Sequence, residues 1–251
     1  MKPKSIVDVI AVLAIVFVVT AVLYPVFAKA REYSGPGPYS APRQIGLAML
    51  QYAQDNDQIL PPRQAYAGWN HELVSWRWII NPYVRNTELY QSRENAAATA
   101  PDIEHDGYNR SYAVNSTTVA KPGASGPFSD VYGGKSKFKD IPNPSSVALL
   151  TETTAAYNDI NVTLPEAFTS EFKPGVNRGA LFMGDREKNS AYLFADGHVR
   201  GYSPLQTLNA GGKNLWTRDN SDFSPSETVA ASKVLQYSID NYREMQRKRG
   251  E

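Results

Sequence analysis

YLFADGHVR, residues Tyr192–Arg200, is the clearest local pattern in this chain of 251 residues. An Asp-Gly pair stands between two short segments that contain apolar residues. Asp-Gly favours a two-residue turn of type I′, because both turn positions accept positive φ. The stretch therefore predicts an antiparallel hairpin with Asp196 and Gly197 at its turn. The turn therefore explains why Asp196 and Gly197 stand here, without any catalytic role for them.

Two further segments predict elements on either side of this hairpin. Upstream, Ser145–Thr151 (SSVALLT) is typical of a buried strand. Downstream, Ser224 and Glu227 form an S-x-x-E capping box, and Pro225 takes the first helical position, so we expect a C-terminal helix from here. Apolar residues follow the box at helical spacing: Val234, Leu235, Ile239, Tyr242 and Met245. The helix is therefore amphipathic, and its basic last turns suit a solvated end or contact with an anionic surface.

Nearer the N-terminus, a helix is expected to begin near Arg43 and to end at Pro61 and Pro62. It carries an apolar stripe at helical spacing: Ile45, Met49 and Tyr52. We expect this stripe to pack in the core rather than to form a recognition surface. The Gly-Pro run at Gly35–Pro38 should interrupt any helix that arrives from further upstream.

Val9–Ala28 is an uncharged run of twenty residues, VIAVLAIVFVVTAVLYPVFA. As a helix it extends about 30 Å, the thickness of one hydrocarbon core. We therefore expect a single transmembrane helix with a kink near Pro25. A cleaved secretory signal is the rival interpretation, because Lys2 and Lys4 precede the run. The run is longer, however, than the apolar region of about 7–15 residues that such signals carry.

The charges that flank this run favour a cytoplasmic N-terminus and place the polar remainder outside the cytoplasm. Asp8 lies at the entrance of the run. Its carboxylate either reaches the interface or pairs with a positive group on a neighbouring subunit. We accordingly divide the chain into a membrane anchor, residues 1–32, a head, residues 33–223, and a C-terminal helix, residues 224–251.

Six segments, taken in order and spacing, carry a family resemblance. They are LYPVFAKARE (Leu23–Glu32), RQIGLAMLQYAQDNDQILPP (Arg43–Pro62), NPYVRNTELYQS (Asn81–Ser92), YNRSYAVN (Tyr108–Asn115), PSSVALLTE (Pro144–Glu152) and YLFADGHVR (Tyr192–Arg200). The chain resembles the bacterial prepilin-like proteins of the type IV pilin and type II secretion pseudopilin class. More narrowly, it is similar to the subgroup with a C-terminal H-x9-DG processing-associated domain.

The resemblance implies an α+β fold in which a pilin-like helix packs on an antiparallel β-sheet head. It implies a single-pass protein of the cell membrane, with a periplasmic or extracellular head. Its function would be structural rather than enzymatic, in a type IV pilus or type II secretion-like system. Membrane lipid and other pilin-like subunits or secretion machinery would be its partners, with Asp8 and Pro25 in the assembling segment.

The chain departs from this family at two motifs. Family members usually begin with Gly-Phe-Thr-Leu-Ile-Glu and are cut after the glycine, whereas Pro3 takes the glycine position here and Asp8 keeps the acid. The histidine of H-x9-DG is replaced by Arg186, although Asp196 and Gly197 remain. An anchor that keeps its N-terminus is therefore the alternative to a processed subunit.

Three tryptophans cluster in the sequence among several tyrosines: Trp69, Trp76 and Trp78. Such a group is expected to fill a core, and its alternative is an aromatic platform for a ligand. The second function that we consider is accordingly a surface-anchored module that binds glycans through these three residues.

Composition and motif spacing exclude several other functions. The net charge of +1, from 26 basic and 25 acidic residues, argues against a nucleic-acid binder with a broad basic surface. The absence of cysteine excludes disulfides, thiolate zinc sites and a cysteine nucleophile. His71, His105 and His198 show no metal-ligand spacing such as H-E-x-x-H. We therefore expect no metal, no cofactor and no catalytic residue.

Overall fold

The computed structural model describes residues 39–69, 71–92, 107–109, 111–130, 136–152, 159–160 and 189–249. The chain separates into two compact units, Met1–Pro38 and Tyr39–Glu251, and all of these residues belong to the second. The predicted span Val9–Ala28, with Asp8 and Pro25, lies outside the described residues. Within the described ranges, no helix combines the length and the apolar character that a membrane crossing requires.

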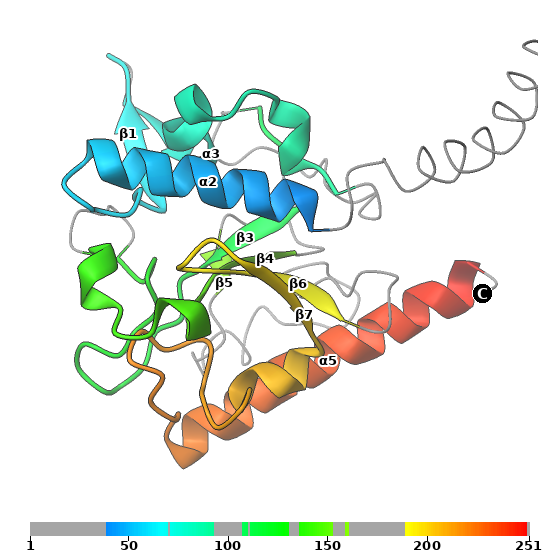
Figure 1. The fold of residues 1–251 in the computed structure, drawn as a ribbon. Coiled ribbons are helices and arrows are strands. Elements are labelled where there is room, and N and C mark those ends of the chain that lie inside the picture. The colour runs from blue at the N-terminus through cyan, green and yellow to red at the C-terminus, as the bar shows by residue number, and fades with distance from the viewer. Residues whose placement is uncertain are drawn as a thin grey trace, which may run out of the picture. The chain divides into compact units, whose positions relative to one another are not determined.

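The described part of the chain confirms the predicted α+β class (Figure 1). Its helices are α2 (Ser40–Asp55), α3 (Trp76–Ile80) and α5 (Pro225–Arg249). Its strands are β1 (Gln64–Ala67), β2 (Glu72–Ser75), β3 (Tyr112–Asn115), β4 (Ala148–Glu152), β5 (Asp159–Ile160), β6 (Ser190–Phe194) and β7 (Val199–Tyr202). Short 3₁₀ turns are η1 (Asn81–Tyr83), η2 (Thr87–Tyr90), η3 (Phe138–Asp140), η4 (Pro144–Ser146) and η5 (Pro204–Leu208).

The strands form two sheets. β1 and β2 make an antiparallel ribbon, and the other strands make a five-stranded sheet in the order β5-β3-β4-β6-β7. Neighbouring strands of the larger sheet are antiparallel, except that β5 runs parallel to β3. The strand predicted at Ser145–Thr151 corresponds to β4, which is central in the sheet and buried along its whole length.

The hairpin of β6 and β7 is confirmed, but its turn is not of the predicted type. Gly197 has a φ of +87°, whereas Asp196 has no positive φ. The N–H of Gly197 donates to the carbonyl of Phe194 at 2.9 Å, which gives a type I turn followed by a left-handed glycine. The type I′ prediction is therefore wrong. The reason lies in Asp196, whose Oδ1 accepts from the N–H of His198 at 3.1 Å and so favours this turn.

Both faces of the five-stranded sheet are covered, because successive residues of each strand point to opposite sides. Leu193 of β6 packs in one core with Ile45 and Met49 of α2, as the predicted apolar stripe requires. Its neighbour Phe194 packs in a second core with Trp216. This second core also contains three residues of α5: Ala231, Val234 and Leu235. Figure 1 accordingly shows α2 and α5 on opposite sides of the sheet.

α2 ends at Asp55, earlier than the proline pair at 61–62 that was predicted to end it. The chain leaves the helix through a turn in which Asp57 and Gln58 have φ of 52° and 62°. The N–H of Gln58 returns to the carbonyl of Ala53 at 2.7 Å. A left-handed turn that caps the last carbonyls, rather than a proline, therefore ends this helix.

The predicted capping box at the start of α5 is confirmed. The N–H of Ser224 donates to Oε2 of Glu227 at 2.9 Å, and the N–H of Glu227 lies 3.4 Å from Oγ of Ser224. Oε1 of Glu227 also accepts from the N–H of Ala120 at 2.7 Å. Partial burial alone would raise the pKa of Glu227, but these hydrogen bonds outweigh it and lower that pKa. The box thus also ties α5 to the loop after β3.

Asn115, at the end of β3, joins three segments of the fold through its buried side chain. Its Nδ2 donates to the carbonyls of Ala148 at 2.9 Å and of Trp216 at 3.0 Å, and its Oδ1 accepts from the N–H of Thr117 at 3.1 Å. A Cβ on Gly126 would lie 2.5 Å from this Oδ1, so only glycine fits beside it. One amide therefore fixes the loop of Trp216 against the sheet.

Candidate functional site

The hairpin of β1 and β2 holds aromatic rings out into solvent. Trp69, in the connecting turn, has a relative exposure of 101%, and Tyr66 is also exposed. The rings of Tyr66 and His71 meet edge-on, with centroids 6.5 Å apart. Tyr66 lies opposite Leu73 on one face of the ribbon, whereas Val74 on the other face is buried. The ribbon thus packs through one face and presents Tyr66, Trp69 and His71 outward.

The three tryptophans that the sequence singles out do not share a surface. Trp76 begins α3 and has no exposed surface, 0%, because it packs edge-on against Tyr90 with ring centroids 5.9 Å apart. Trp78, two residues further along α3, is exposed. Residues two apart on a helix do not face the same way. Trp76 is therefore a core residue out of reach of any ligand, while Trp69 and Trp78 remain accessible.

Arg77 is a fully buried arginine that the sequence analysis did not single out. Its Nη2 donates to the backbone carbonyl of Tyr112 in β3, and its own carbonyl accepts from the hydroxyl of Tyr90 at 3.1 Å. Its guanidinium lies 4.5 Å from the ring centre of Trp76. These contacts join α3 to the larger sheet, so the role of Arg77 is structural. A basic residue between two tryptophans carries no sequence pattern that predicts burial.

Asp196 and Gly197 lie on the turn between β6 and β7, and their contacts explain them structurally. The carboxylate of Asp196 lies 2.5 Å from Nδ1 of His198, whose ring stacks on Phe194 with centroids 4.4 Å apart. A Cβ on Gly197 would lie 3.1 Å from Cδ1 of Leu50 in α2. The pair therefore shapes a turn that lies close to α2, in agreement with the structural interpretation of this motif.

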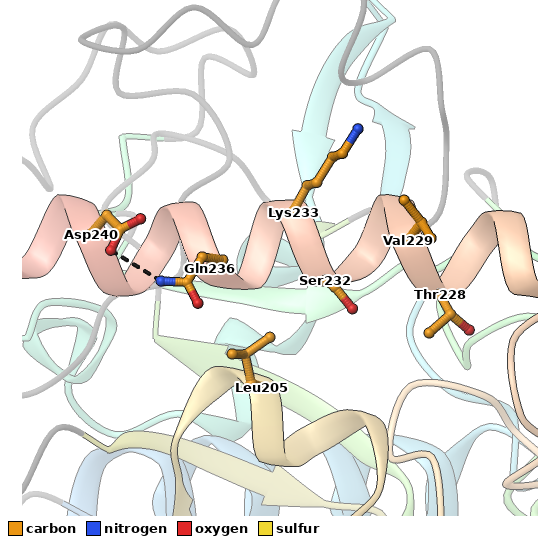
Figure 2. A pocket seen from close by; sticks show the side chains of 7 residues that line it. All are labelled: Leu205, Thr228, Val229, Ser232, Lys233, Gln236 and Asp240. Atoms are coloured by element: carbon orange, nitrogen blue, oxygen red, sulfur yellow. Dashed lines mark hydrogen bonds between the residues drawn. The ribbon is translucent and has the colours of Figure 1, made fainter.

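A groove of about 710 Å³ lies between η5 and α5 (Figure 2). It is lined by Leu205, Thr228, Val229, Ser232, Lys233, Gln236 and Asp240. Leu205 and Val229 are large apolar residues with exposures of 37% and 56%, while Lys233 and Asp240 bring opposite charges. Three residues of the predicted stripe of α5 are buried, namely Val234, Leu235 and Ile239, whereas the side chains of Tyr242 and Met245 lie outside the described part of the chain. The sequence pattern did not predict this groove, because its opposite wall comes from a 3₁₀ turn without apolar periodicity.

The search for metal-binding clusters and the comparison with known proteins identify no further candidate functional site among the described residues. No cluster of three or more His, Asp or Glu residues that could hold a metal ion occurs within the described ranges. Comparison of the chain with protein-family models, with curated protein sequences and with solved structures finds no match. Among the described residues, the exposed hairpin and the groove are therefore the surfaces on which we argue a functional role.

Proposed function

We propose that this chain is a membrane-anchored, pseudopilin-like structural protein of a type IV pilus or type II secretion-like system. One observation carries the proposal. The uncharged run Val9–Ala28 is separated by only ten residues, Lys29–Pro38, from a compact α+β unit that begins at Tyr39. A run of this length suits one membrane crossing, and the unit behind it has its own buried cores.

The order of elements behind the proposed anchor supports this assignment. α2 begins at Ser40 and is the first described element of the compact unit. It buries Ile45 and Met49 against the sheet, next to Leu193. A helix that enters the head first and lies on a largely antiparallel sheet is the arrangement expected of a pilin-like head. The proposed role is structural, so it requires no catalytic residue, no cofactor and no nucleic-acid partner.

Asp8→Ala is expected to reduce the assembly of the chain with neighbouring subunits about tenfold, which corresponds to about 1.4 kcal/mol. The reason is that a carboxylate at the membrane pairs with a positive group, and the low dielectric strengthens this attraction. Cross-linking of the full chain in membranes measures the assembled fraction. Asp8→Glu keeps the charge and serves as the matched control. Equal assembly of Asp8→Ala and the unchanged chain would remove the proposed role of Asp8.

The intact mass of the chain in the same membrane extract separates the possible fates of the N-terminus. Loss of Met1–Pro3 would indicate prepilin processing and support a filament subunit. A full-length mass would indicate an uncleaved anchor and would favour a tethered head with another task over a filament subunit. A loss near Ala28 or Ala30 would indicate a secreted soluble protein and would contradict the proposed function.

The exposed aromatic rings favour a second candidate function, a surface-anchored module that binds glycans. Trp69 and Tyr66 on the hairpin, and Trp78 on α3, offer apolar ring faces that can stack on sugars. If this candidate holds, Trp69→Ala should weaken the binding of the full chain to a glycan array at least about tenfold. A chain that binds no glycan, or that binds equally well without Trp69, would leave the structural role as the better explanation.

A further inference from the structure

We propose that the groove between η5 and α5 is the docking site for a second copy of this chain. In this arrangement the two α5 helices lie antiparallel, and a two-fold axis passes between Gln236 and position 237. The observations that carry the proposal are the exposed apolar side chains on the groove and the order of charges along its helical wall. The pairing concerns the head alone and does not depend on the proposed function.

The groove carries one positive and one negative side chain, so its charges can complement those of the same groove on a second copy. Lys233 and Asp240 are seven residues apart, so they lie on one face of α5, two turns and about 10.5 Å apart. Two antiparallel copies of this helix, centred midway between these residues, bring each Lys233 to the Asp240 of the other copy. An isologous contact has this property, because each copy offers the same surface to the other.

Both charges are available for such a contact. In the part of the chain that the structure describes, the side-chain ammonium of Lys233 has no ion-pair or hydrogen-bond partner, and the residue is exposed. Oδ1 of Asp240 accepts from Nε2 of Gln236 at 3.0 Å and lies 3.6 Å from Nη1 of Arg243, yet the Asp240 side chain is 58% exposed. Exposed ion pairs contribute only about 0.2–1 kcal/mol each, so these pairs would fix the register rather than supply the affinity.

The apolar side chains supply the affinity in this arrangement. Figure 2 shows Leu205 opposite the turn of α5 that carries Ser232 and Gln236. This places Leu205 of each copy close to the two-fold axis, where the two side chains can leave water together, and Val229 extends the apolar surface along the groove. A contact of this symmetry closes on itself, so it makes pairs of heads and does not by itself extend into a filament.

Cysteine cross-linking tests the pairing directly, because the chain contains no cysteine of its own. The full-length chain with Gln236→Cys is treated, inside the cells that express it, with a short membrane-permeant bismaleimide cross-linker and is then separated by size. Equivalent Gln236 positions lie about 1.5 Å apart along the axis of an antiparallel pair, whereas equivalent Val229 positions lie about 22 Å apart. Gln236→Cys should therefore give at least about ten times more covalent dimer than Val229→Cys, the matched control in the same groove.

Three other cross-linking results would each contradict the proposal. Equal cross-linking from Gln236→Cys and Val229→Cys would mean a parallel or non-specific contact and would overturn the antiparallel arrangement. Absence of dimer from both variants would show that a second copy is not the occupant of the groove. Cross-linking of Gln236→Cys to a different protein alone would likewise overturn it.

Charge reversal supplies a second, independent readout in the Gln236→Cys background. Lys233→Asp and Asp240→Lys should each reduce the covalent dimer about fivefold, because each places like charges opposite one another. The double variant should restore it, because the two pairs then form with their charges exchanged. Asp222→Lys reverses an exposed acid outside the groove and should leave the dimer unchanged. A double variant that stays as weak as the single variants would refute the proposed pairing of Lys233 with Asp240.

Discussion

Trp76→Ala should lower the free energy of unfolding by about 3–5 kcal/mol, whereas Trp69→Ala should change it by less than about 0.5 kcal/mol. The two residues are of the same type and seven positions apart, but Trp76 has no exposed surface and Trp69 is fully exposed. Truncation of Trp76 leaves a cavity beside Tyr90 that the surrounding core can only partly fill. Truncation of Trp69 removes a side chain that the fold does not need.

The loss at position 76 also affects the buried charge beside it. The guanidinium of Arg77 lies over the Trp76 ring, so the alanine variant removes an aromatic neighbour from a cation that stays buried. Trp76→Phe keeps a ring against Tyr90 and should fall between the wild-type chain and the alanine variant. Urea unfolding followed by far-UV circular dichroism measures all three variants. A stability of Trp76→Ala within about 0.5 kcal/mol of wild type would contradict the core placement of this side chain.

The same comparison shows why sequence reasoning could not decide the tryptophans one by one. Residue type alone favours burial for all three tryptophans. Whether each one is buried or exposed depends on the secondary-structure element that carries it, and these elements are known only from the structure. Trp69 lies in the turn of a ribbon, and α3 turns Trp76 inward and Trp78 outward. The number of rings that are exposed to solvent could therefore not be predicted before the β1–β2 register and the short helix α3 were known.

Local patterns predicted those features that depend on neighbours in sequence. The capping box at Ser224 formed as expected, because its hydrogen bonds join residues three positions apart. The hairpin at Asp196 also formed, but its turn type depended on a bond from the His198 N–H to a side chain, which composition does not reveal. The apolar stripe of α2 predicted its buried face correctly.

Contacts between segments that are far apart in the sequence could not be predicted, because they do not depend on neighbouring residues. The groove joins η5 to α5, and its apolar wall includes Leu205, which stands in no periodic pattern. The buried Arg77 and the amide of Asn115 are likewise placed by partners far along the chain, such as Tyr112 and Trp216. Polar residues in such positions look like ordinary surface residues until the tertiary structure supplies their partners.

Asn115→Asp should destabilise the compact unit by at least about 3 kcal/mol at pH 7. The amide donates to the carbonyls of Ala148 and Trp216, at 2.9 and 3.0 Å, and an aspartate offers no donor to either. Each stranded buried carbonyl costs about 1–3 kcal/mol, and the uncompensated charge adds to this. The two side chains have nearly the same shape, so the loss reports the hydrogen bonds rather than a cavity.

The cost of Asn115→Asp should depend on pH in a defined direction. Burial and the two facing carbonyl oxygens should raise the pKa of the new carboxyl in the folded state above its unfolded value of about 3.9. The folded state then holds a proton that the unfolded state has already lost, so stability falls as the pH rises from about 4 to the folded pKa. Acidification to pH 4 should therefore recover part of the loss, because a protonated carboxyl can donate to one carbonyl.

Urea unfolding at pH 4 and pH 7 measures both parts of this expectation, and Asn143→Asp is the matched control. Asn143 is exposed before η4 and its side chain makes no capping hydrogen bond, so its replacement should change stability by less than about 0.5 kcal/mol at either pH. A loss that is equal at both pH values would mean that the carboxylate finds water or a cation. In that case Asn115 would not be the enclosed link that holds the Trp216 loop on the sheet, and the tight fit of Gly126 against its Oδ1 would need another explanation.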